Sequence, residues 1–282
     1  MSKLLIQRSG RASSKLTGNG TGGLVLAPDA KIQSMKYDFK YGYALGSAVV
    51  DGGGDGTGDA DEDVNVLHFP ATNNILYQTG NDTQSAARSN KAMLAAGLTL
   101  AAAGESYEFA PYFSKEDESI SSPAVGGHNV FSVGLSDFYM RAVLQCADVS
   151  AATEIFAGFK KVEGFEDDPD DFDEAYGVSI HGGGNPADVK EFKILNAAAT
   201  VRTDTGINKA DATDIEIEVR VSKAGVCTLF VDGVQLNATD HSIVGMTFDA
   251  GEQVYPALYV VLTVAATLTI SELEFGAQAA RK

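Results

Sequence analysis

One segment, residues 214–236, restricts most strongly what this chain can fold into. In the sequence DIEIEVRVSKAGVCTLFVDGVQL, apolar side chains occupy every second position from Ile215 to Val221, and charged side chains occupy the positions between them. Because successive strand side chains point to opposite faces of a sheet, the pattern predicts a strand with one buried and one hydrated face. SKAG predicts a turn into a second strand, and Asp232-Gly233 predicts a further tight turn.

Similar short segments succeed one another from about residue 105 to the end of the chain, with turn residues between them. They include NVFSVGLSDFYMRAVLQCADV, EIFAGFKKVE, AYGVSIHGG, VKEFKILNAAATVRT and TLTISELEFGA. About eight strands without interleaved helices indicate an all-β, antiparallel sandwich. One short helix is predicted over residues 82–97, where Asp82 or Thr83 can cap it and Gly97 can end it.

The composition supports a folded, soluble chain with an ordinary core. Apolar residues make up 44% of 282 positions, which excludes a disordered chain. Cys146 and Cys227 each lie in an apolar run, so we expect two buried free thiols and no disulfide framework. The longest apolar stretch, residues 254–270, contains Pro256 and is too short for a membrane span. We expect no signal peptide and no membrane partner.

The charge is distributed unevenly along the chain. The formal net charge is −17, but residues 1–48 hold seven basic against two acidic residues, so the remainder carries −22. An acidic body repels phosphates, which argues against nucleic-acid binding. A basic arm suits docking on an acidic partner surface, and its candidate partner-binding residues are Lys3, Arg8, Arg11 and Lys15. A tail that only improves solubility remains the alternative.

These shifts in composition divide the chain into three parts. Residues 1–48 are interpreted as a basic extended arm followed by the first strands, and residues 49–65 as an acidic, glycine-rich loop. Residues 66–282 are interpreted as the β-sandwich domain.

The hairpin and its neighbours resemble the concanavalin A-like (laminin-G/jelly-roll) sandwich superfamily. GVCTLFVDGVQL is similar to the strand of these proteins that ends in Asp-Gly, FYMRAVLQCAD to an early strand, and LTISELEFGA to the closing strand. The resemblance covers roughly residues 105–277 and implies a jelly-roll sandwich. Together with the basic arm, it implies a structural protein of a tailed-phage virion that forms homo-oligomers, for example trimers.

No segment specifies a reaction, so we expect no enzyme. Retaining glycosidases need two carboxylates about 5 Å apart, whereas Asp214, Glu216 and Glu218 follow the plain spacing of an exposed strand face. The four histidines, His68, His128, His181 and His241, are isolated, without the clustered spacing of metal ligands. HGGGNP, residues 181–186, is interpreted as a loop at the end of a strand.

Sugar binding without catalysis stays open as an alternative function. Sugars commonly stack on aromatic rings, and the chain has no Trp. The tyrosines that can replace it are Tyr107, Tyr112, Tyr139, Tyr176, Tyr255 and Tyr259. Most of them are expected in the core or on the faces of the sheets.

Calcium is the one cofactor that the sequence suggests. Asp51, Asp55, Asp59 and Glu62 match positions 1, 5, 9 and 12 of an EF-hand loop. Gly53 brings no ligand oxygen at position 3, and the flanking segments resemble strands where that motif requires helices. The alternative is an acidic connector. A second acidic insertion, residues 166–174, is predicted to be a solvated excursion.

From the sequence we expect a non-enzymatic virion structural protein, specifically a capsid decoration (cement) protein on the capsid surface. It would be assembled in the host cytoplasm, would dock on the capsid shell protein through its arm and would contact copies of itself. The alternative is a carbohydrate-binding module or a tail-associated adhesin on the same fold, with a glycan as its partner.

Overall fold

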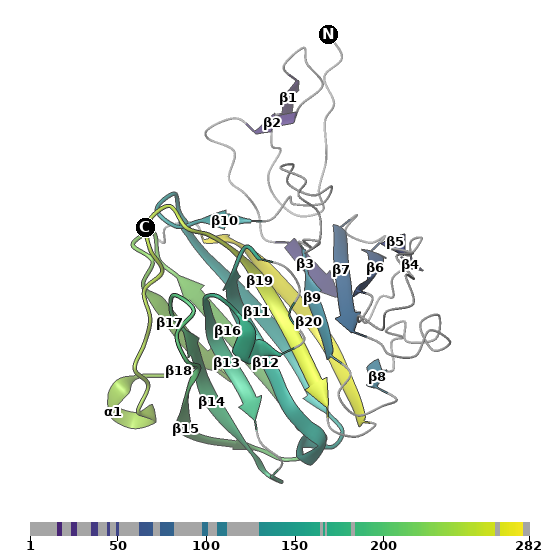
Figure 1. Cartoon of the computed structure of the whole chain (residues 1–282), viewed down its shortest axis with the longest axis vertical. Coiled ribbons are helices and arrows are strands. Elements are labelled where there is room, and N and C mark those ends of the chain that lie inside the picture. Colours follow the sequence, from purple (N-terminus) through teal and green to yellow (C-terminus); the bar gives the residue numbers. More distant parts are fainter. Residues whose placement is uncertain are drawn as a thin grey trace.

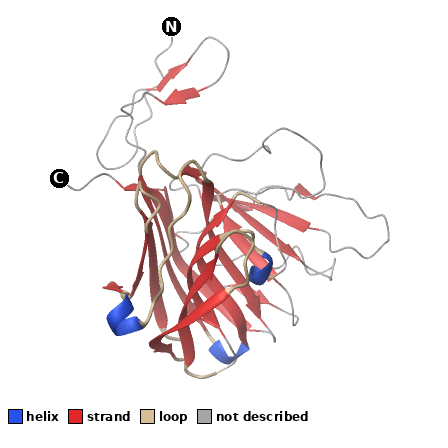
Figure 2. Ribbon diagram, turned by 60° about the vertical axis from the view of Figure 1, so that its left-hand side comes forward, coloured by secondary structure: helices blue, strands red, loops and turns tan. Residues whose placement is uncertain are grey.

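The computed structural model describes two facing β-sheets with short helical turns at their periphery (Figure 1, Figure 2). Backbone and side chains are described for residues 106–111, 130–163, 166, 168–181, 184–261 and 267–277. The backbone alone is described for residues 262, 266 and 278 and for the strands that precede residue 101. All strand pairs are antiparallel in these ranges, so the predicted all-β sandwich is confirmed.

The larger sheet has eleven strands in the described part of the chain. Their order is β15 (Val201–Lys209), β14 (Ala187–Ile194), β13 (Ala175–His181), β12 (Ala152–Lys161), β19 (Gln253–Leu262), β9 (Ser106–Ala110), β7 (Asn74–Asn81), β6 (Glu62–Phe69) and β4 (Ala44–Leu45). Two short strands join it at the side, β10 (Phe131–Ser132) beside β19 and β5 (Val49–Val50) beside β6.

The smaller sheet has seven described strands. Their order is β18 (Val234–Gln235), β17 (Cys227–Val231), β16 (Asp214–Val221), β11 (Asp137–Cys146), β20 (Ala266–Gln278) and β3 (Met35–Asp38), with β8 (Leu98–Leu100) beside β20. Strands β1 (Leu16–Gly18) and β2 (Leu24–Leu26) pair with each other. Since β11 pairs with β20 and β12 pairs with β19, strands distant in sequence lie side by side in both sheets.

The hairpin predicted from residues 214–236 is present as β16, β17 and β18. The Gly225 amide donates to the Ser222 carbonyl at 2.8 Å, which closes the first turn. Asp232 and Gly233 have φ values of 50° and 76°. Both residues of the second turn are therefore left-handed, as a two-residue hairpin with native strand twist requires.

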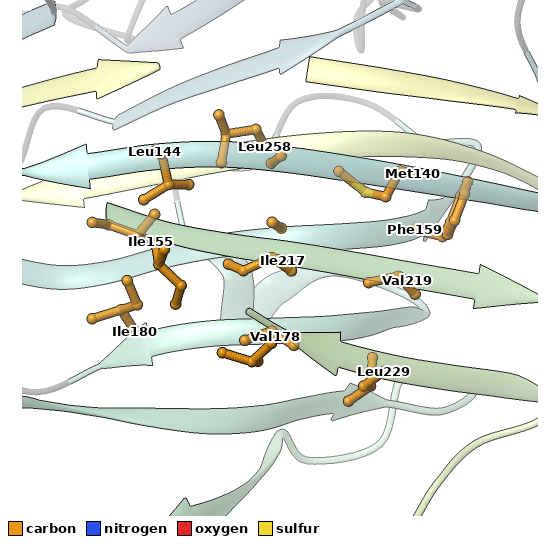
Figure 3. Close-up of a cluster of buried hydrophobic side chains, with 14 of the residues drawn as sticks. Met140, Leu144, Ile155, Phe159, Val178, Ile180, Ile217, Val219, Leu229 and Leu258 are labelled. Carbon is orange, nitrogen blue, oxygen red and sulfur yellow. The ribbon is translucent and has the colours of Figure 1, made fainter. Parts of the chain in front are cut away.

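The main core lies between the two sheets (Figure 3). Met140 and Leu144 from β11 and Ile217 from β16 meet Ile155 and Leu258 of the larger sheet, all at 0% exposure. This packing explains the alternation in β16, because only one of its faces meets the opposite sheet. Truncating such a side chain to Ala typically costs about 2–5 kcal/mol.

Helical turns contribute little to the fold. The described ones are η3 (Val149–Ala151), η4 (Pro169–Asp171) and α1 (Ala238–His241). The helix predicted over residues 82–97 lies outside the described residues, as do residues 1–15 of the predicted arm. Within residues 1–48, β3 pairs with β20 and β4 pairs with β6, whereas β1 and β2 form a separate two-stranded sheet.

Candidate functional site

The outer face of the larger sheet, which points away from the smaller sheet, is buried over much of its described area. It carries a second apolar cluster that includes Phe156, Phe192 and Tyr259. Phe172, from the connection between β12 and β13, covers them, with its ring centroid 5.7 Å from that of Tyr259. The Phe156 and Phe192 rings lie 4.8 Å apart. These rings stabilise the fold and present no open surface for stacking.

Two glycines on neighbouring strands bring the backbones close beneath this cluster. Gly158 of β12 lies opposite Gly177 of β13. A Cβ at Gly158 would lie 2.3 Å from the Tyr176 carbonyl oxygen, and one at Gly177 would lie 2.3 Å from that of Ala157. The Phe156 ring fills the space above both glycines. Glycine is therefore required at both positions for the ring to pack on the sheet.

A buried lysine stands beside the aromatic cluster. Lys160 is fully buried, and its Nζ lies 3.1 Å from Glu108 Oε2 and 3.3 Å from Glu163 Oε1. The ammonium also lies 4.0 Å from the centroid of the Phe172 ring. The Tyr255 hydroxyl donates to Glu108 Oε1 at 3.1 Å. A buried ammonium needs such partners, and these tie the segment after β12 to the sheet.

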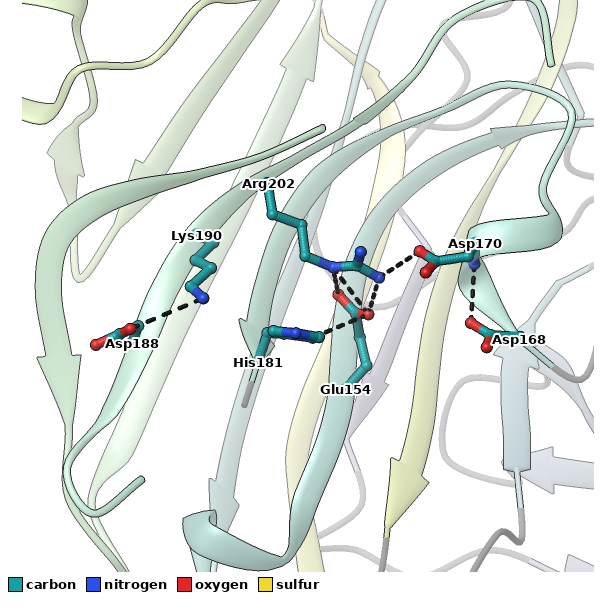
Figure 4. Close-up of polar contacts among 7 residues, drawn as sticks. All are labelled: Glu154, Asp168, Asp170, His181, Asp188, Lys190 and Arg202. Atoms are coloured by element: carbon teal, nitrogen blue, oxygen red, sulfur yellow. Dashed lines mark hydrogen bonds and ion pairs between the residues drawn. The ribbon is translucent and has the colours of Figure 1, made fainter. Parts of the chain in front are cut away.

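Polar side chains gather where this apolar face meets solvent (Figure 4). They come from strands β12 to β15 and from η4 with the residue before it. We call them the rim cluster: Glu154, Asp168, Asp170, His181, Asp188, Lys190 and Arg202. These residues span positions 154 to 202 of the chain, and the pairing of β12, β13, β14 and β15 in that order brings them together.

Arg202 is the centre of the rim cluster. Its Nε donates to both carboxylate oxygens of Glu154 at 3.1 Å, and its Nη2 donates to Glu154 Oε2 and to Asp170 Oδ1 (Figure 4). The Glu154 side chain is 3% exposed, whereas the Asp170 side chain is 48% exposed. The guanidinium therefore bridges a buried carboxylate and a hydrated one, and multiple hydrogen bonds fix its plane.

The opposite charges of Arg202 and its carboxylate partners keep Arg202 and Asp170 ionised. Burial opposes the charged form of Arg202, but the carboxylates of Glu154 and Asp170 outweigh it and raise the pKa of the guanidinium. Burial would likewise raise the pKa of Asp170, yet the hydrogen bond and charge of Arg202 hold that pKa below its usual value. Arg202 and Asp170 therefore form a permanently charged pair near neutral pH.

Three further side chains extend the rim cluster toward solvent. His181 is 32% exposed, and its Nδ1 lies 3.4 Å from Glu154 Oε2 without the geometry of a hydrogen bond. Lys190 Nζ lies 3.8 Å from Asp188 Oδ2. Asp188 of β14 lies opposite His181 of β13. The hydrogen-bond donor Lys190 and the acceptor Asp188 therefore lie next to the imidazole of His181 on the same face of the sheet.

This arrangement fits hydrogen bonding to a polar ligand better than proton transfer. Hydrolysis of a glycosidic bond needs a carboxylic acid whose pKa is raised so that it can donate a proton. Asp170 is shifted in the opposite direction, and both oxygens of Glu154 already accept from Arg202. Within the described ranges no three His, Cys, Asp or Glu side chains are placed to hold a metal ion.

The residues tested for glycosidase chemistry lie on the opposite side of the molecule. Glu216 and Glu218 alternate with the core residues of β16 and lie on the outer face of the smaller sheet. Arg141 donates to Glu216 at 2.8 Å, and Arg220 donates to Glu218 at 2.5 Å. The predicted regular strand is confirmed. Gln145 similarly donates to Asp214 at 3.0 Å.

The other residues singled out from the sequence fall mostly in the core or in loops. Cys146 and Cys227 are buried and free, as predicted. Burial raises the pKa of both thiols. The loop predicted at residues 181–186 joins β13 to β14. His181 lies in β13 and His241 in α1, and His68 and His128 have no described side chain.

The tyrosines proposed for sugar stacking are largely unavailable. Those at 0–4% exposure are Tyr107, Tyr176, Tyr255 and Tyr259. Tyr139 is half-buried on the outer face of the smaller sheet, where its hydroxyl donates to Glu274 at 2.5 Å. Tyr112 lies outside the described residues. The expectation that most tyrosines belong to the core is confirmed.

The calcium and arm residues stay predictions. Asp51, Asp55 and Asp59 lie outside the described residues, and Glu62 is the first residue of β6. Val49 of β5 lies opposite Val64 of β6 in an antiparallel pair, so the predicted strands flank the acidic segment. The arm residues Lys3, Arg8, Arg11 and Lys15 also lie outside the described part of the chain.

The prediction that residues 166–174 form a solvated excursion is only partly correct, because Asp168, Asp170, Asp171 and Asp173 are exposed but the rest of the described segment is not. Pro169, Phe172 and Glu174 are buried, because the segment folds back onto the outer face of the larger sheet. Asp170 is held there by Arg202. The acidic residues dominate the composition of the segment, but its two apolar residues determine where it packs.

Sequence reasoning missed Glu154 and Arg202 as site residues and treated His181 only as isolated. Each lies in an ordinary strand segment, and β12, β13 and β15 provide no local motif. The only available signal was a charged residue inside an otherwise apolar strand, as at Glu154 in ATEIFAGF. Such a residue needs a partner when it is buried, but the sequence does not say which.

No family model matches the chain, and no curated protein matches it. Among the described residues, no helix is both long and apolar enough to cross a membrane.

Solved structures with related shapes share little sequence with this chain. The carbohydrate recognition domain of Emp47p is 11% identical, with a TM-score of 0.44 over 90% of this chain and 100% of that chain. A protein of unknown function from Shewanella oneidensis is 13% identical, with a TM-score of 0.42 over 89% and 90%. An alginate lyase from Pseudomonas aeruginosa is 14% identical, with a TM-score of 0.40 over 64% and 86%. At these values the similarity carries no functional assignment.

Proposed function

We propose that this protein is a non-catalytic carbohydrate-binding module and that the rim cluster binds the sugar. The observation that carries the proposal is the fixed array of polar groups beside an apolar sheet face, with Arg202 held by Glu154 and Asp170. Sugars present many hydroxyl groups, and they are recognised by donors and acceptors whose orientation is set before binding. His181, Lys190 and Asp188 supply such groups at partial exposure.

Binding is favoured over cleavage by the charge state of the cluster. The lowered pKa of Asp170 removes it as a proton donor near neutral pH. Glu154 is buried against Arg202 and lacks access to a glycosidic oxygen.

The test is a glycan array followed by calorimetry on the full chain. We expect micromolar to millimolar binding to a subset of glycans and at least a tenfold loss in His181→Ala and in Lys190→Ala. Arg220→Ala, on the outer face of the smaller sheet, is the matched control and should bind normally. Equal binding by all three variants would remove the rim cluster from the site.

An assay for released reducing ends tests the non-catalytic part of the proposal. We expect no release from any glycan that the array identifies. Release that stops in Glu154→Gln would show a glycoside hydrolase and would overturn the proposal.

A second candidate function, a capsid decoration protein of a phage virion, is supported by the charge distribution. A balance of +5 over residues 1–48 against −22 in the remainder suits an arm that docks on an acidic shell. Co-sedimentation with capsids should then require residues 1–30, and cross-linking should show trimers of the chain. Capsid binding that survives the truncation would contradict a docking arm. The two functions are compatible, since a virion protein can also bind host glycans.

A further inference from the structure

A buried amine and two buried carboxyl groups meet on the outer face of the larger sheet. Lys160 of β12 is at 0% exposure, and its Nζ lies 3.1 Å from Glu108 Oε2 and 3.3 Å from Glu163 Oε1. The side chains of Glu108 and Glu163 are only 4% and 10% exposed. Two carboxyl groups therefore share one ammonium, and burial makes two full negative charges around it costly.

Glu163 is the carboxyl group that is suited to carry a proton. Burial raises its pKa, although the charge of Lys160 and the amide of Asp173 act in the opposite direction. The Asp173 amide donates to Glu163 Oε2 at 2.8 Å, so Oε1 is the oxygen that lies beside Lys160. Glu163 is therefore fixed where it can take a proton from the amine and pass it to a neighbouring oxygen.

Glu108 is arranged as the group that the amine can attack. The Tyr255 hydroxyl donates to Glu108 Oε1 at 3.1 Å, while Lys160 contacts the other oxygen, Oε2. A donor on one carboxyl oxygen stabilises the negative charge that develops there when a nucleophile adds to the carboxyl carbon. Since Oε2 is bonded to that carbon, contact with Oε2 places Nζ near it, as an attack requires.

Aromatic rings separate these groups from water. The centroid of the Phe172 ring lies 4.0 Å from Lys160 Nζ, and that of the Tyr255 ring lies 5.6 Å from it. Both residues are buried. A condensation releases water, and a site that excludes water protects the product from hydrolysis.

We propose that Lys160 and Glu108 condense to an amide bond that crosslinks the larger sheet. The bond from Nζ to the Glu108 carboxyl carbon forms, and one carbon–oxygen bond of that carboxyl group breaks. The ammonium gives up two protons, which Glu163 passes to the departing oxygen, and this oxygen leaves as water. An ammonium and a carboxylate thus become one amide and one water, without an oxidant or an activating group.

The crosslink joins β12 to β9, which lie on either side of β19. It connects residues that are 52 positions apart in the chain. A covalent link over such a distance restricts the unfolded chain, as a disulfide does, and therefore stabilises the folded state. This inference is independent of the proposed carbohydrate binding.

Mass spectrometry of the denatured full chain, followed by a peptide map, tests the bond. We expect a mass one water below that of the unlinked chain, and a map in which the peptides that contain Glu108 and Lys160 stay joined. A chain without this loss overturns the inference, and so does a lost water that maps to any other position. Neither result depends on whether a variant folds.

Variants then test the assigned roles. Lys160→Met and Glu108→Ala should each restore the full mass, and Glu163→Gln should slow formation of the link about a hundredfold after synthesis. Lys161→Met is the matched control, because this neighbouring lysine is 41% exposed and should not affect the link. A water loss that persists in Glu108→Ala would show that Lys160 reacts with Glu163, and would overturn the assigned pair.

Discussion

The outer faces of the two sheets differ in how they meet water. On the smaller sheet, charged side chains alternate with core residues and pair across strands, as Arg141 does with Glu216 and Glu272. On the larger sheet, β12 and β13 are buried on both faces, and charges there lie beneath aromatic rings or at the rim. The same kinds of residue therefore stabilise the fold to different degrees, because burial determines what each contact contributes.

The largest expected difference concerns aromatic residues on the two faces. Phe156→Ala removes a ring at 0% exposure from the outer cluster and should lower the free energy of unfolding by about 3–5 kcal/mol. Phe230→Ala removes a half-buried ring that stacks with Arg220 on the smaller sheet, and should cost about 1 kcal/mol. Urea denaturation measures both. Equal losses would contradict the contrast between the faces.

Arginines in ion pairs should show the next largest difference. Arg202→Met leaves Glu154 buried without its cation and should destabilise the fold by about 3 kcal/mol. Arg141→Met, on the wetter face, should cost about 1 kcal/mol or less. The double variant Glu154→Gln/Arg202→Met should recover part of the loss. If it does not, the cost lies in packing of the arginine and not in the unpaired charge.

Two carboxylates, Glu174 just before β13 of the larger sheet and Glu216 in β16 of the smaller sheet, should change the stability with pH in opposite directions. Burial, together with a hydrogen bond and charge repulsion from Glu252, raises the pKa of Glu174 to about 7. Because this pKa is raised on folding, the stability that Glu174 contributes is present below its usual pKa of 4.5 and is lost as pH rises through about 7. Thermal denaturation should show this loss, and Glu174→Gln should reduce it.

Glu216 on the smaller sheet should show the opposite pH dependence of stability, and this is the smallest effect that we expect. A hydrogen bond from Arg141 lowers the pKa of Glu216, so its contribution is present above its usual pKa of 4.5 and is lost as pH falls. Glu216→Gln should therefore flatten the acid limb of the stability curve while leaving the limb near pH 7 unchanged. A change near pH 7 would show that the two carboxylates are not independent.

The contrast between the sheets also explains how much of the molecule could be predicted. The alternation of apolar and charged residues in β16 can be recognised in the sequence because one face of the strand is exposed to water. It predicts the sandwich and the hairpin correctly. In β12, Lys160 has the composition of a surface residue but is buried, and its partner Glu108 lies 52 residues away. Nothing local in the sequence signals that pairing. The rim cluster was missed for the same reason, since strand register creates it.

The pairing of β5 with β6 bears on how this protein can be engineered. Residues 51–61 join two strands that are already antiparallel neighbours, with Val50 opposite Asp63. The entropy of closing a loop grows only with the logarithm of its length, so doubling such a connection costs about 0.6 kcal/mol. A foreign peptide inserted there would begin and end on adjacent strands. The acidic segment is therefore a natural position for displaying an epitope on the sandwich.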